Sequence, residues 1–430
     1  MAQVSSPRLA AAIAQLRERP IPGTEKGFGV PAPGATVSAA SLGARRPTLF
    51  GPGFTMPVLV LREAAVARNI AAMADYCAVA GVRLAPHGKT TMAPQLFARQ
   101  LAAGAWAVTA ATVGELHVYR AFGVPRVLLA NELTDPAGAA WLAGELAADP
   151  GFDSYVYADS LPGVRLLDEA VRQESPARPL PVLVELGYPG GRTGCRGLAE
   201  AEAVARAVAQ AGSLRLAGVA GYEGGIGRDR SPQTIGKVAA YCRELRALGE
   251  RLAATGLAPD ELILSAGGSA FFDVVARELT SGSVGRPAPV VVLRSGVYIA
   301  FDHGLYAGMV PSPPPLLEPA LELWAHVLSR PEPGLALACA GRRDVAFDAG
   351  LPVPLRIRGR DGSLRPARDM RAVRLDDQHC YLQLPPGAEL APGEVVCFGV
   401  SHPCTTFDKW RVIPVVDDDY RVVDAIYTFF

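Results

Sequence analysis

The chain of 430 residues carries 42 basic and 42 acidic side chains, so its formal net charge is zero. Without a basic excess, it lacks the electrostatic field that holds nucleic acid or an anionic membrane surface. With 50% hydrophobic residues the chain can bury a large core, and it is too long for one ordinary domain. We therefore expect a large domain and a smaller one.

Residues 1–19 have a helical apolar pattern through Leu9, Ile13 and Leu16. They contain no uninterrupted apolar core followed by a small-residue cleavage site, so we expect no signal peptide. No apolar stretch approaches the roughly 20 residues that span a bilayer. The seven cysteines are an odd number without a Cys-x-x-Cys pair, which favours reduced thiols and a cytoplasmic location.

Short apolar runs alternate with longer amphipathic stretches between residue 82 and about residue 300. The runs are rich in Val, Leu and Ile without polar alternation, which is typical of parallel strands buried on both faces. The intervening stretches, such as 199–211 and 234–252, are predicted helices. The eight predicted strands are 82–85, 106–109, 126–130, 154–158, 181–186, 214–220, 261–265 and 290–293.

Eight strand and helix units predict an α/β fold with a TIM-type (β/α)8 barrel, whose chemistry lies at the C-terminal ends of the strands. The alternative is an open doubly wound sheet, which has the same alternation. That fold usually has a phosphate loop after its first strand, and Pro86-His87-Gly88-Lys89-Thr90 lacks the Gly-x-Gly-x-x-Gly spacing. We therefore favour the barrel.

The pattern changes after residue 305. A proline-rich linker over 311–315 is followed by short alternating runs with Gly and Pro turns, which predicts a C-terminal antiparallel β domain. An earlier predicted strand, 58–61, precedes the first barrel helix and is expected to join that domain. The predicted organisation is an N-terminal extension and strand over 1–61, a barrel over 62–305 and a β domain over 306–430.

Lys89 is one of only four lysines and directly follows the apolar run 82–85. A lysine at the end of a barrel strand is suited to covalent catalysis, because desolvation there lowers its pKa toward the amine that attacks an aldehyde. Such a lysine would bind pyridoxal phosphate as a Schiff base, and the cofactor would supply an electron sink. The alternative is a surface lysine near a helix end.

The segment Ser265-Ala266-Gly267-Gly268-Ser269 follows the apolar run 262–264. Paired glycines let backbone N–H groups approach a phosphate, and a helix starting near Ala270 would point its positive end at the anion. In TIM barrels a phosphate commonly docks after strands seven and eight. The alternative is an ordinary turn between a strand and a helix, with a serine cap.

Two further glycine-containing segments end predicted strands. Residues 185–196 include Arg192, a fixed cation for a pyridine nitrogen or a carboxylate, among glycines that permit close approach to a planar ring. Tyr222 lies in Gly-Tyr-Glu-Gly-Gly and would stack on a cofactor or transfer a proton. The alternatives are a flexible loop with a solvated arginine and an aromatic plug that closes the barrel.

His402 and Cys404 form a His-x-Cys pair in the predicted β domain. Side chains two apart in a strand share a face, so the pair would offer one nitrogen and one sulfur ligand to zinc. Two protein ligands leave positions for water and substrate, as at a catalytic zinc. The alternative is a buried histidine beside an inert thiol.

In this order, Pro-His-Gly-Lys-Thr, Gly-Arg-Thr-Gly, Gly-Tyr-Glu-Gly, Ser-Ala-Gly-Gly-Ser and a late His-x-Cys resemble the motifs of the D-serine dehydratase and D-threonine aldolase family. The resemblance covers roughly residues 56–417. It implies an alanine-racemase-like architecture, in which an N-terminal barrel carries pyridoxal phosphate and a C-terminal β domain carries a metal site. The chain departs from the family in having Thr91-Met92 where a second His-Lys is often found, and in its N-terminal extension of about 50 residues.

The resemblance also implies roles for individual residues. Lys89 would be the Schiff-base lysine, Tyr222 an active-site tyrosine beside the cofactor ring, and Arg192 would contact cofactor or substrate. For the reaction itself we take Lys89 as the candidate general base, with Tyr222 as the alternative. It implies His-x-Cys in zinc-dependent dehydratases and His-x-Asp in D-threonine aldolases, so His402 and Cys404 favour the dehydratases. The remaining candidate cofactor contacts are His87, Ser265, Gly267, Gly268, Ser269, Arg294 and Tyr298.

Together these assignments predict a pyridoxal phosphate- and zinc-dependent dehydratase. It would eliminate water from a β-hydroxy D-amino acid such as D-serine, giving a 2-oxo acid and ammonia. The alternatives are a metal-dependent D-threonine aldolase that releases glycine and an aldehyde, an amino-acid racemase and a non-catalytic pyridoxal phosphate carrier. The expected partner is a small D-amino acid, with no nucleic acid and no membrane, and the resemblance implies a homodimer.

Overall fold

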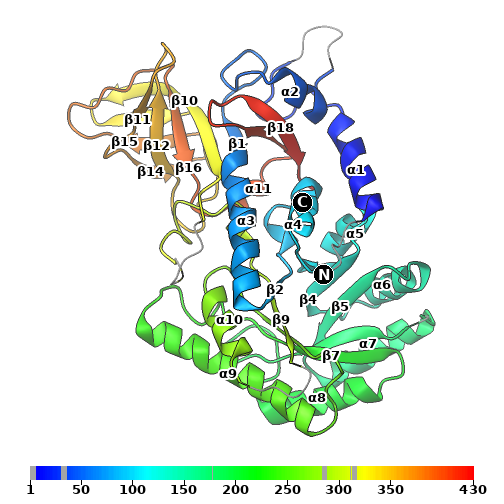
Figure 1. Cartoon of the computed structure of the whole chain (residues 1–430). Helices are drawn as coiled ribbons and strands as arrows, with labels where there is room; N and C mark the ends of the chain where they lie inside the picture. The colour runs from blue at the N-terminus through cyan, green and yellow to red at the C-terminus, as the bar shows by residue number, and fades with distance from the viewer. Residues whose placement is uncertain (1–5, 31–35, 177, 283–287, 310, 312–316) are drawn as a thin grey trace.

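The computed structural model describes residues 6–30, 36–176, 178–282, 288–309, 311 and 317–430. The chain folds into an α/β barrel and a β domain, and helix α3 (Glu63–Ala80) runs between them (Figure 1). The proline-rich linker predicted over 311–315 lies almost entirely outside the described residues. Two helices precede these parts, α1 (Pro7–Glu18) and α2 (Ala39–Arg45).

Eight parallel strands form the barrel sheet, in the order β2-β9-β8-β7-β6-β5-β4-β3. Its two end strands meet, because the Trp106 N–H donates to the Leu84 carbonyl (2.7 Å) and the Thr109 N–H donates to the Pro86 carbonyl (2.9 Å). The predicted closed barrel is therefore confirmed, with strand ends shifted by a few residues. The strands are β2 (Arg83–Leu84), β3 (Val108–Ala110), β4 (Arg126–Glu132), β5 (Asp153–Ala158), β6 (Leu180–Glu185), β7 (Leu214–Ala220), β8 (Ile263–Ala266) and β9 (Val290–Leu293).

A helix follows each of the first seven strands, and a short 3-10 helix, η2 (Val297–Ile299), follows β9. Helix α3 packs beside η2 and α10, so it takes the eighth position around the barrel (Figure 1). Several of these helices begin at a residue whose oxygen accepts backbone N–H bonds, including Thr112, Asp135, Ser160 and Ser231. The helices are α4 (Pro94–Ala102), α5 (Val113–Ala121), α6 (Pro136–Ala148), α7 (Leu161–Gln173), α8 (Leu198–Gln210), α9 (Pro232–Ala254) and α10 (Phe272–Thr280).

The second sheet contains ten strands, and the early strand β1 (Val58–Arg62) lies inside it, as expected from the sequence. β1 pairs antiparallel with β10 and parallel with β17. The parallel pair departs from the predicted antiparallel domain, because β1 comes from a distant part of the chain and no hairpin links it to β17. The other strands are β10 (Leu321–Glu332), β11 (Leu335–Ala338), β12 (Val353–Arg358), β13 (Leu364–Pro366), β14 (Arg371–Leu375), β15 (Cys380–Gln383), β16 (Val395–Gly399), β17 (Val412–Val416) and β18 (Val422–Tyr427).

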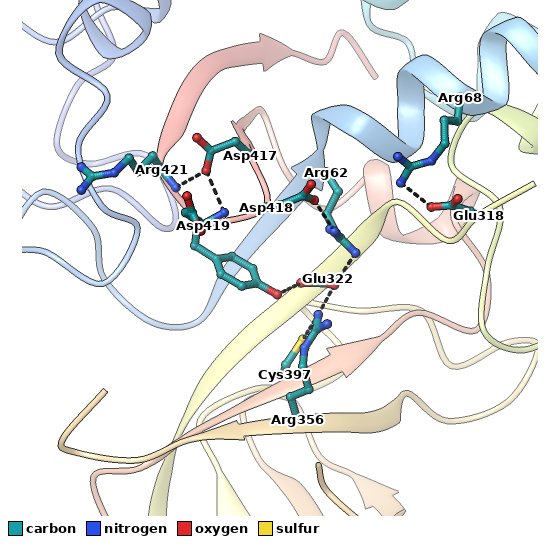
Figure 2. A network of polar contacts seen from close by, with 11 residues as sticks. Arg62, Arg68, Glu318, Glu322, Arg356, Cys397, Asp417, Asp418, Asp419 and Arg421 are labelled. Carbon is teal, nitrogen blue, oxygen red and sulfur yellow. Dashed lines mark hydrogen bonds and ion pairs between the residues drawn. The ribbon is translucent and has the colours of Figure 1, made fainter. Parts of the chain in front are cut away.

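A polar network around one buried glutamate fixes β1 and the start of α3 to the β domain (Figure 2). Its centre is Glu322 on β10, which is 3% exposed and forms ion pairs with Arg356 and, at 3.9 Å, with Arg62. The Tyr420 hydroxyl also donates to Glu322 (2.9 Å), and Arg62 pairs with Asp418. Because Arg62 directly precedes the first barrel helix, this network couples the orientation of the β domain to that of the barrel.

Among the described helices, none is both long and apolar enough to cross a membrane.

The segment at and after the last strand, β18, contacts the barrel. The Phe429 N–H donates to the Met92 carbonyl (3.0 Å), and the Gln95 side chain donates to the Ala425 carbonyl (3.3 Å). The end of the chain thereby supports the segment that follows Lys89.

Candidate active site

A cavity of about 160 Å³ lies at the C-terminal ends of the barrel strands. This is the end of the barrel where small-molecule sites occur. Six of the ten predicted cofactor contacts line it: His87, Lys89, Arg192, Tyr222, Gly268 and Arg294. The sequence motifs therefore converge in space, although they lie more than 200 residues apart in the chain.

Lys89 reaches the cavity from a 3-10 turn, η1 (Gly88–Thr90), that follows β2. A Cβ at position 88 would overlap the Tyr119 hydroxyl, so glycine is required for the turn to lie against α5. The Lys89 side chain is exposed at the cavity mouth. The expectation of a desolvated lysine is therefore wrong, because η1 carries the residue beyond the buried end of the strand.

Two arginines in the cavity have different environments. Arg294 is 6% exposed, and its guanidinium donates to Ser265 Oγ (2.7 Å) and to the Gly221 carbonyl (2.6 Å). Arg192 is exposed and lies over the Tyr222 ring, with 4.2 Å from its guanidinium carbon to the ring centroid. Burial raises the pKa of Tyr222, which keeps its hydroxyl protonated. Arg294 is thus held rigidly, whereas Arg192 is available to a ligand.

The predicted phosphate loop does not present an open anion site in this structure. The Gly267 N–H (3.1 Å) and the Gly268 N–H (2.7 Å) both donate to the buried carboxylate of Glu223. Ser269 Oγ accepts from the Val297 N–H (3.2 Å). The geometry suits an anion, as expected, but a carboxylate of the chain itself occupies it.

Two other predicted contacts do not line the cavity. The Ser265 hydroxyl donates to the Val292 carbonyl (3.1 Å) and supports Arg294 from below. Tyr298 is 2% exposed, and its hydroxyl accepts from Gln100 (2.8 Å), so it packs behind the strand ends. The prediction that Tyr298 contacts a cofactor is not supported, because η2 turns its side chain into the core.

The cavity also contains residues that the motifs did not indicate. Tyr157 on β5 and Glu185 on β6 line it, and Glu132 on β4 lies beside Glu185. Each is a polar residue at or near the end of an apolar strand. This position could have identified all three from the sequence as candidate lining residues. Asn131, Thr193, Ala111 and Ala130 complete the lining.

Several buried polar atoms around the cavity have no hydrogen-bond partner within the described residues. They are His87 Nδ1, the Tyr157 hydroxyl, one Glu185 oxygen and both Glu132 oxygens. Burial, and then the charge of Lys89, lower the pKa of His87 well below its usual value, so its ring is neutral. Buried polar groups are nearly always paired, so this set indicates space for a polar ligand. An amine, two guanidinium groups and aromatic side chains fit pyridoxal phosphate.

The His-x-Cys pair lies next to this cavity. His402 is in a loop and Cys404 begins the four-residue helix α11 (Cys404–Phe407), so the expected strand geometry is wrong. The turn at Pro403 nevertheless keeps the imidazole and the thiol close enough for the thiol to shift the pKa of the imidazole. Cys404 Sγ lies 3.5 Å from the hydroxyl oxygen of Thr90, the neighbour of Lys89.

Asp348 orients the histidine of this pair. Its carboxylate lies 2.7 Å from His402 Nδ1, which leaves Nε2 for a metal. The Cys404 side chain, and then the carboxylate of Asp348, raise the pKa of His402 to about 9. Among the described residues no group of three or more His, Cys, Asp or Glu side chains is arranged to hold a metal. A nitrogen and a sulfur ligand with a carboxylate behind the histidine fit a zinc site with open positions.

Comparisons with known proteins agree with this arrangement. Residues 320–416 match the model of a putative serine dehydratase domain. The chain is 28% identical to a D-threonine aldolase from Arthrobacter sp. over 374 residues, covering 86% of this chain and 91% of that protein. It is 27% identical to a D-threo-3-hydroxyaspartate dehydratase from Delftia sp. (strain HT23) over 249 residues, covering 57% of this chain and 61% of that protein.

Solved structures agree as well. The D-threonine aldolase from Filomicrobium marinum superimposes with a TM-score of 0.72 at 27% identity, covering 87% of this chain and 94% of that one. Alanine racemase from Bacillus anthracis shares the fold alone, with a TM-score of 0.58 at 15% identity. The superposition covers 88% of this chain and 99% of that one.

The fold and the relatives define the class: a barrel with a C-terminal β domain, in the alanine-racemase-like arrangement. Within that class, the chain is a relative of the D-serine dehydratase and D-threonine aldolase-like proteins. The resemblance inferred from the ordered motifs is thereby confirmed.

Proposed function

We propose that this protein is a pyridoxal phosphate- and zinc-dependent dehydratase of β-hydroxy D-amino acids such as D-serine. Its named relatives are aldolases and dehydratases of D-amino acids, which supports a D-amino acid lyase as the broader class. The observation that carries the proposal is the approach of Cys404 to Thr90, which places the His-x-Cys pair beside Lys89. A lysine for a cofactor and a pair of metal ligands then face the same substrate.

Lys89 would hold pyridoxal phosphate, with Arg192 and Tyr222 beside it and Arg294 beneath. Bound there, the cofactor supplies an electron sink for bonds that break at the substrate α-carbon. The amine of Lys89 would be the base that removes the substrate α-proton, with Tyr222 as the alternative base. Arg192 binds the substrate carboxylate.

His402 and Cys404 would hold the zinc ion, which supplies a Lewis acid for the β-hydroxyl. Asp348 keeps the imidazole of His402 in the orientation and tautomer that a metal requires. The products of dehydration are a 2-oxo acid and ammonia. A homodimer and a cytoplasmic location remain predictions from the sequence.

An aldolase is the second candidate, because two of the relatives are named D-threonine aldolase. In that reaction Cα–Cβ breaks, and the products are glycine and an aldehyde. The His-x-Cys pair favours the dehydratase, since the family resemblance implies His-x-Asp in the aldolases. The products distinguish the two reactions.

The test begins with the absorbance spectrum of the purified protein with pyridoxal phosphate, for the wild type, Lys89→Ala and Lys237→Ala. Lys237 is an exposed lysine on α9 and serves as the matched control. We expect a Schiff-base absorbance band in the wild type and Lys237→Ala alone. D-serine, L-serine and D-threonine are then added with and without zinc, and we expect zinc-dependent 2-oxo acid from D-serine only. Aldehyde and glycine would instead support the aldolase, and a band that survives in Lys89→Ala would contradict the proposal.

A further inference from the structure

A second cavity lies at the opposite end of the barrel from the candidate active site. Its volume is about 320 Å³, twice that of the cavity beside Lys89. Its lining comes from the N-terminal ends of the barrel strands, whereas catalytic groups of TIM barrels lie at the C-terminal ends. We call it the basal cavity, and the lining residues that matter here are Arg83, Trp106, Arg126, Tyr155, Arg215 and Glu261.

Polar side chains of the basal cavity face the inside of the barrel. Side chains two apart on a strand share a face. Arg83, Arg126 and Tyr155 each lie two positions before a residue that packs inside the barrel. Those interior residues are Ala85, Leu128 and Tyr157. The guanidinium groups therefore point toward the barrel axis and not toward the surrounding helices.

Two of the three arginines that line the basal cavity have no partner in the described part of the chain. Arg126 donates to Asp153 through two nitrogens (3.1 and 2.9 Å), and Asp153 also pairs with Arg178. By contrast, the guanidinium groups of Arg83 and Arg215 make no hydrogen bond or ion pair with any described residue. They come from β2 and β7, which are three places apart in the closed sheet, so they reach the basal cavity from different sides.

Aromatic rings form another part of the lining. Trp106 is 6% exposed, and its ring centroid lies 5.2 Å from that of Tyr155. Burial raises the pKa of Tyr155, so its hydroxyl stays protonated and can donate a hydrogen bond. Glu261 is exposed and is the one carboxylate among the described lining residues. Three guanidinium groups against one carboxylate favour a negatively charged ligand, and the rings favour a carbon skeleton over an inorganic ion.

We propose that the basal cavity binds a small organic anion with two carboxylates on a short carbon skeleton. One carboxylate pairs with Arg83 and the other with Arg215 through charge-assisted hydrogen bonds. The skeleton lies against Trp106 and Tyr155. Neither arginine takes part in the proposed reaction, so the inference goes beyond the proposed function. A ligand held in this way joins strands from distant parts of the chain and stabilises the folded barrel.

The first test is isothermal titration calorimetry at pH 7 on the protein with its cofactor, using succinate, propionate and inorganic phosphate. We expect succinate to bind with a dissociation constant of about 1 mM or below. Propionate has only one carboxylate, and phosphate is too compact to reach both arginines, so each should bind at least about tenfold more weakly. No binding of succinate, or equal affinity for either of the other two ligands, would overturn the inference without any variant.

Variants locate the bound anion. Arg83→Gln and Arg215→Gln should each weaken succinate binding about tenfold, and the double variant should abolish the measurable heat. Arg206→Gln, an exposed change on α8, is the matched control and should bind like the wild type. Arg192→Gln removes an arginine of the candidate active site and should also leave succinate binding unchanged. Binding that survives in R83Q/R215Q, or that is lost in Arg192→Gln, would overturn the inference.

Glu261→Gln tests the charge of the ligand in the opposite direction. It removes the one lining carboxylate that repels an anion, so succinate should bind about threefold more tightly. A damaged fold would not produce such a gain. Weaker binding of succinate in this variant would overturn the assignment of a doubly negative ligand.

This inference and the proposed function can fail separately. A protein without a Schiff-base band that still binds succinate through Arg83 and Arg215 would overturn the proposed function alone. An active lyase that binds succinate and propionate equally well would overturn the role of the basal cavity alone.

Discussion

Replacing Glu132 by glutamine should stabilise the fold, and the gain should grow with pH. Desolvation, and then the charge of Glu185, raise the pKa of the Glu132 carboxyl from 4.5 to about 8. Between these values the folded chain holds a proton that the unfolded chain has released. Stability therefore falls as the pH rises from about 4.5 to about 8, because the folded state binds more protons than the unfolded state. The glutamine variant has no such proton and loses this dependence.

The magnitude follows from the two pKa values. At about 1.36 kcal/mol per pH unit, the interval from 4.5 to about 8 sets an upper limit of about 5 kcal/mol at pH 8. The Glu132 side chain is only partly buried, and the new amide also loses hydration on burial. We therefore expect a gain of about 1–2 kcal/mol at pH 8 and almost none at pH 4.5.

The assay is urea unfolding at pH 5, 6.5 and 8, followed by circular dichroism. The chain has two structural parts, so the comparison uses the difference in midpoint between variant and wild type. The control variant Glu244→Gln, an exposed change on α9, should stay within about 0.5 kcal/mol of the wild type at each pH. The reasoning is refuted if Glu132→Gln is less stable than the wild type at pH 8, or if its gain is the same at pH 5.

Three further predictions concern the metal pair and the network that joins the two parts. Cys404→Ala should keep the cofactor absorbance but lose bound zinc and turnover. The control variant Cys339→Ala should keep both bound zinc and turnover. Turnover of the wild type in excess chelator would contradict the role of zinc. Asp348→Asn should weaken zinc binding about 10–100-fold, measured by competition with a chromophoric chelator, and unchanged affinity would refute its role. Glu322→Ala leaves Arg356 without its buried partner and should cost about 3 kcal/mol in urea unfolding, since Arg356 keeps some exposure; a loss below about 1 kcal/mol would count against the network.

The barrel was predictable from sequence because its strands are buried on both faces. Runs such as 290–293 contain only apolar residues that no surface strand would carry, and the eight runs recur with helices between them. The lysine, the two arginines and Tyr222 were predictable as well, because a barrel collects the residues at its strand ends into one place. The position of β1 in the β domain followed from its place before the first barrel helix.

Other features depend on contacts between distant segments, which periodicity does not encode. Glu223 follows Tyr222 directly, yet only the fold reveals that its carboxylate bonds to Gly267 and Gly268. The proximity of Glu132 to Glu185 was missed for the same reason, since these two residues lie 53 positions apart and on strands that are not adjacent. The segment with His402 and Cys404 was expected to be extended, so that side chains two apart would share a face, whereas Pro403 adopts a helical conformation that starts α11.

Because β1 lies between β10 and β17, the β domain is not complete without residues from the N-terminal part of the chain. A C-terminal fragment that begins at residue 306 would lack β1. Strands β10 and β17 would then each present an unpaired edge that attracts other chains. Exchange of β domains between relatives should therefore succeed only when residues 58–62 travel with the donor domain. Proteolysis between the two parts should likewise leave a nicked but associated molecule, since the chain crosses from one part to the other more than once.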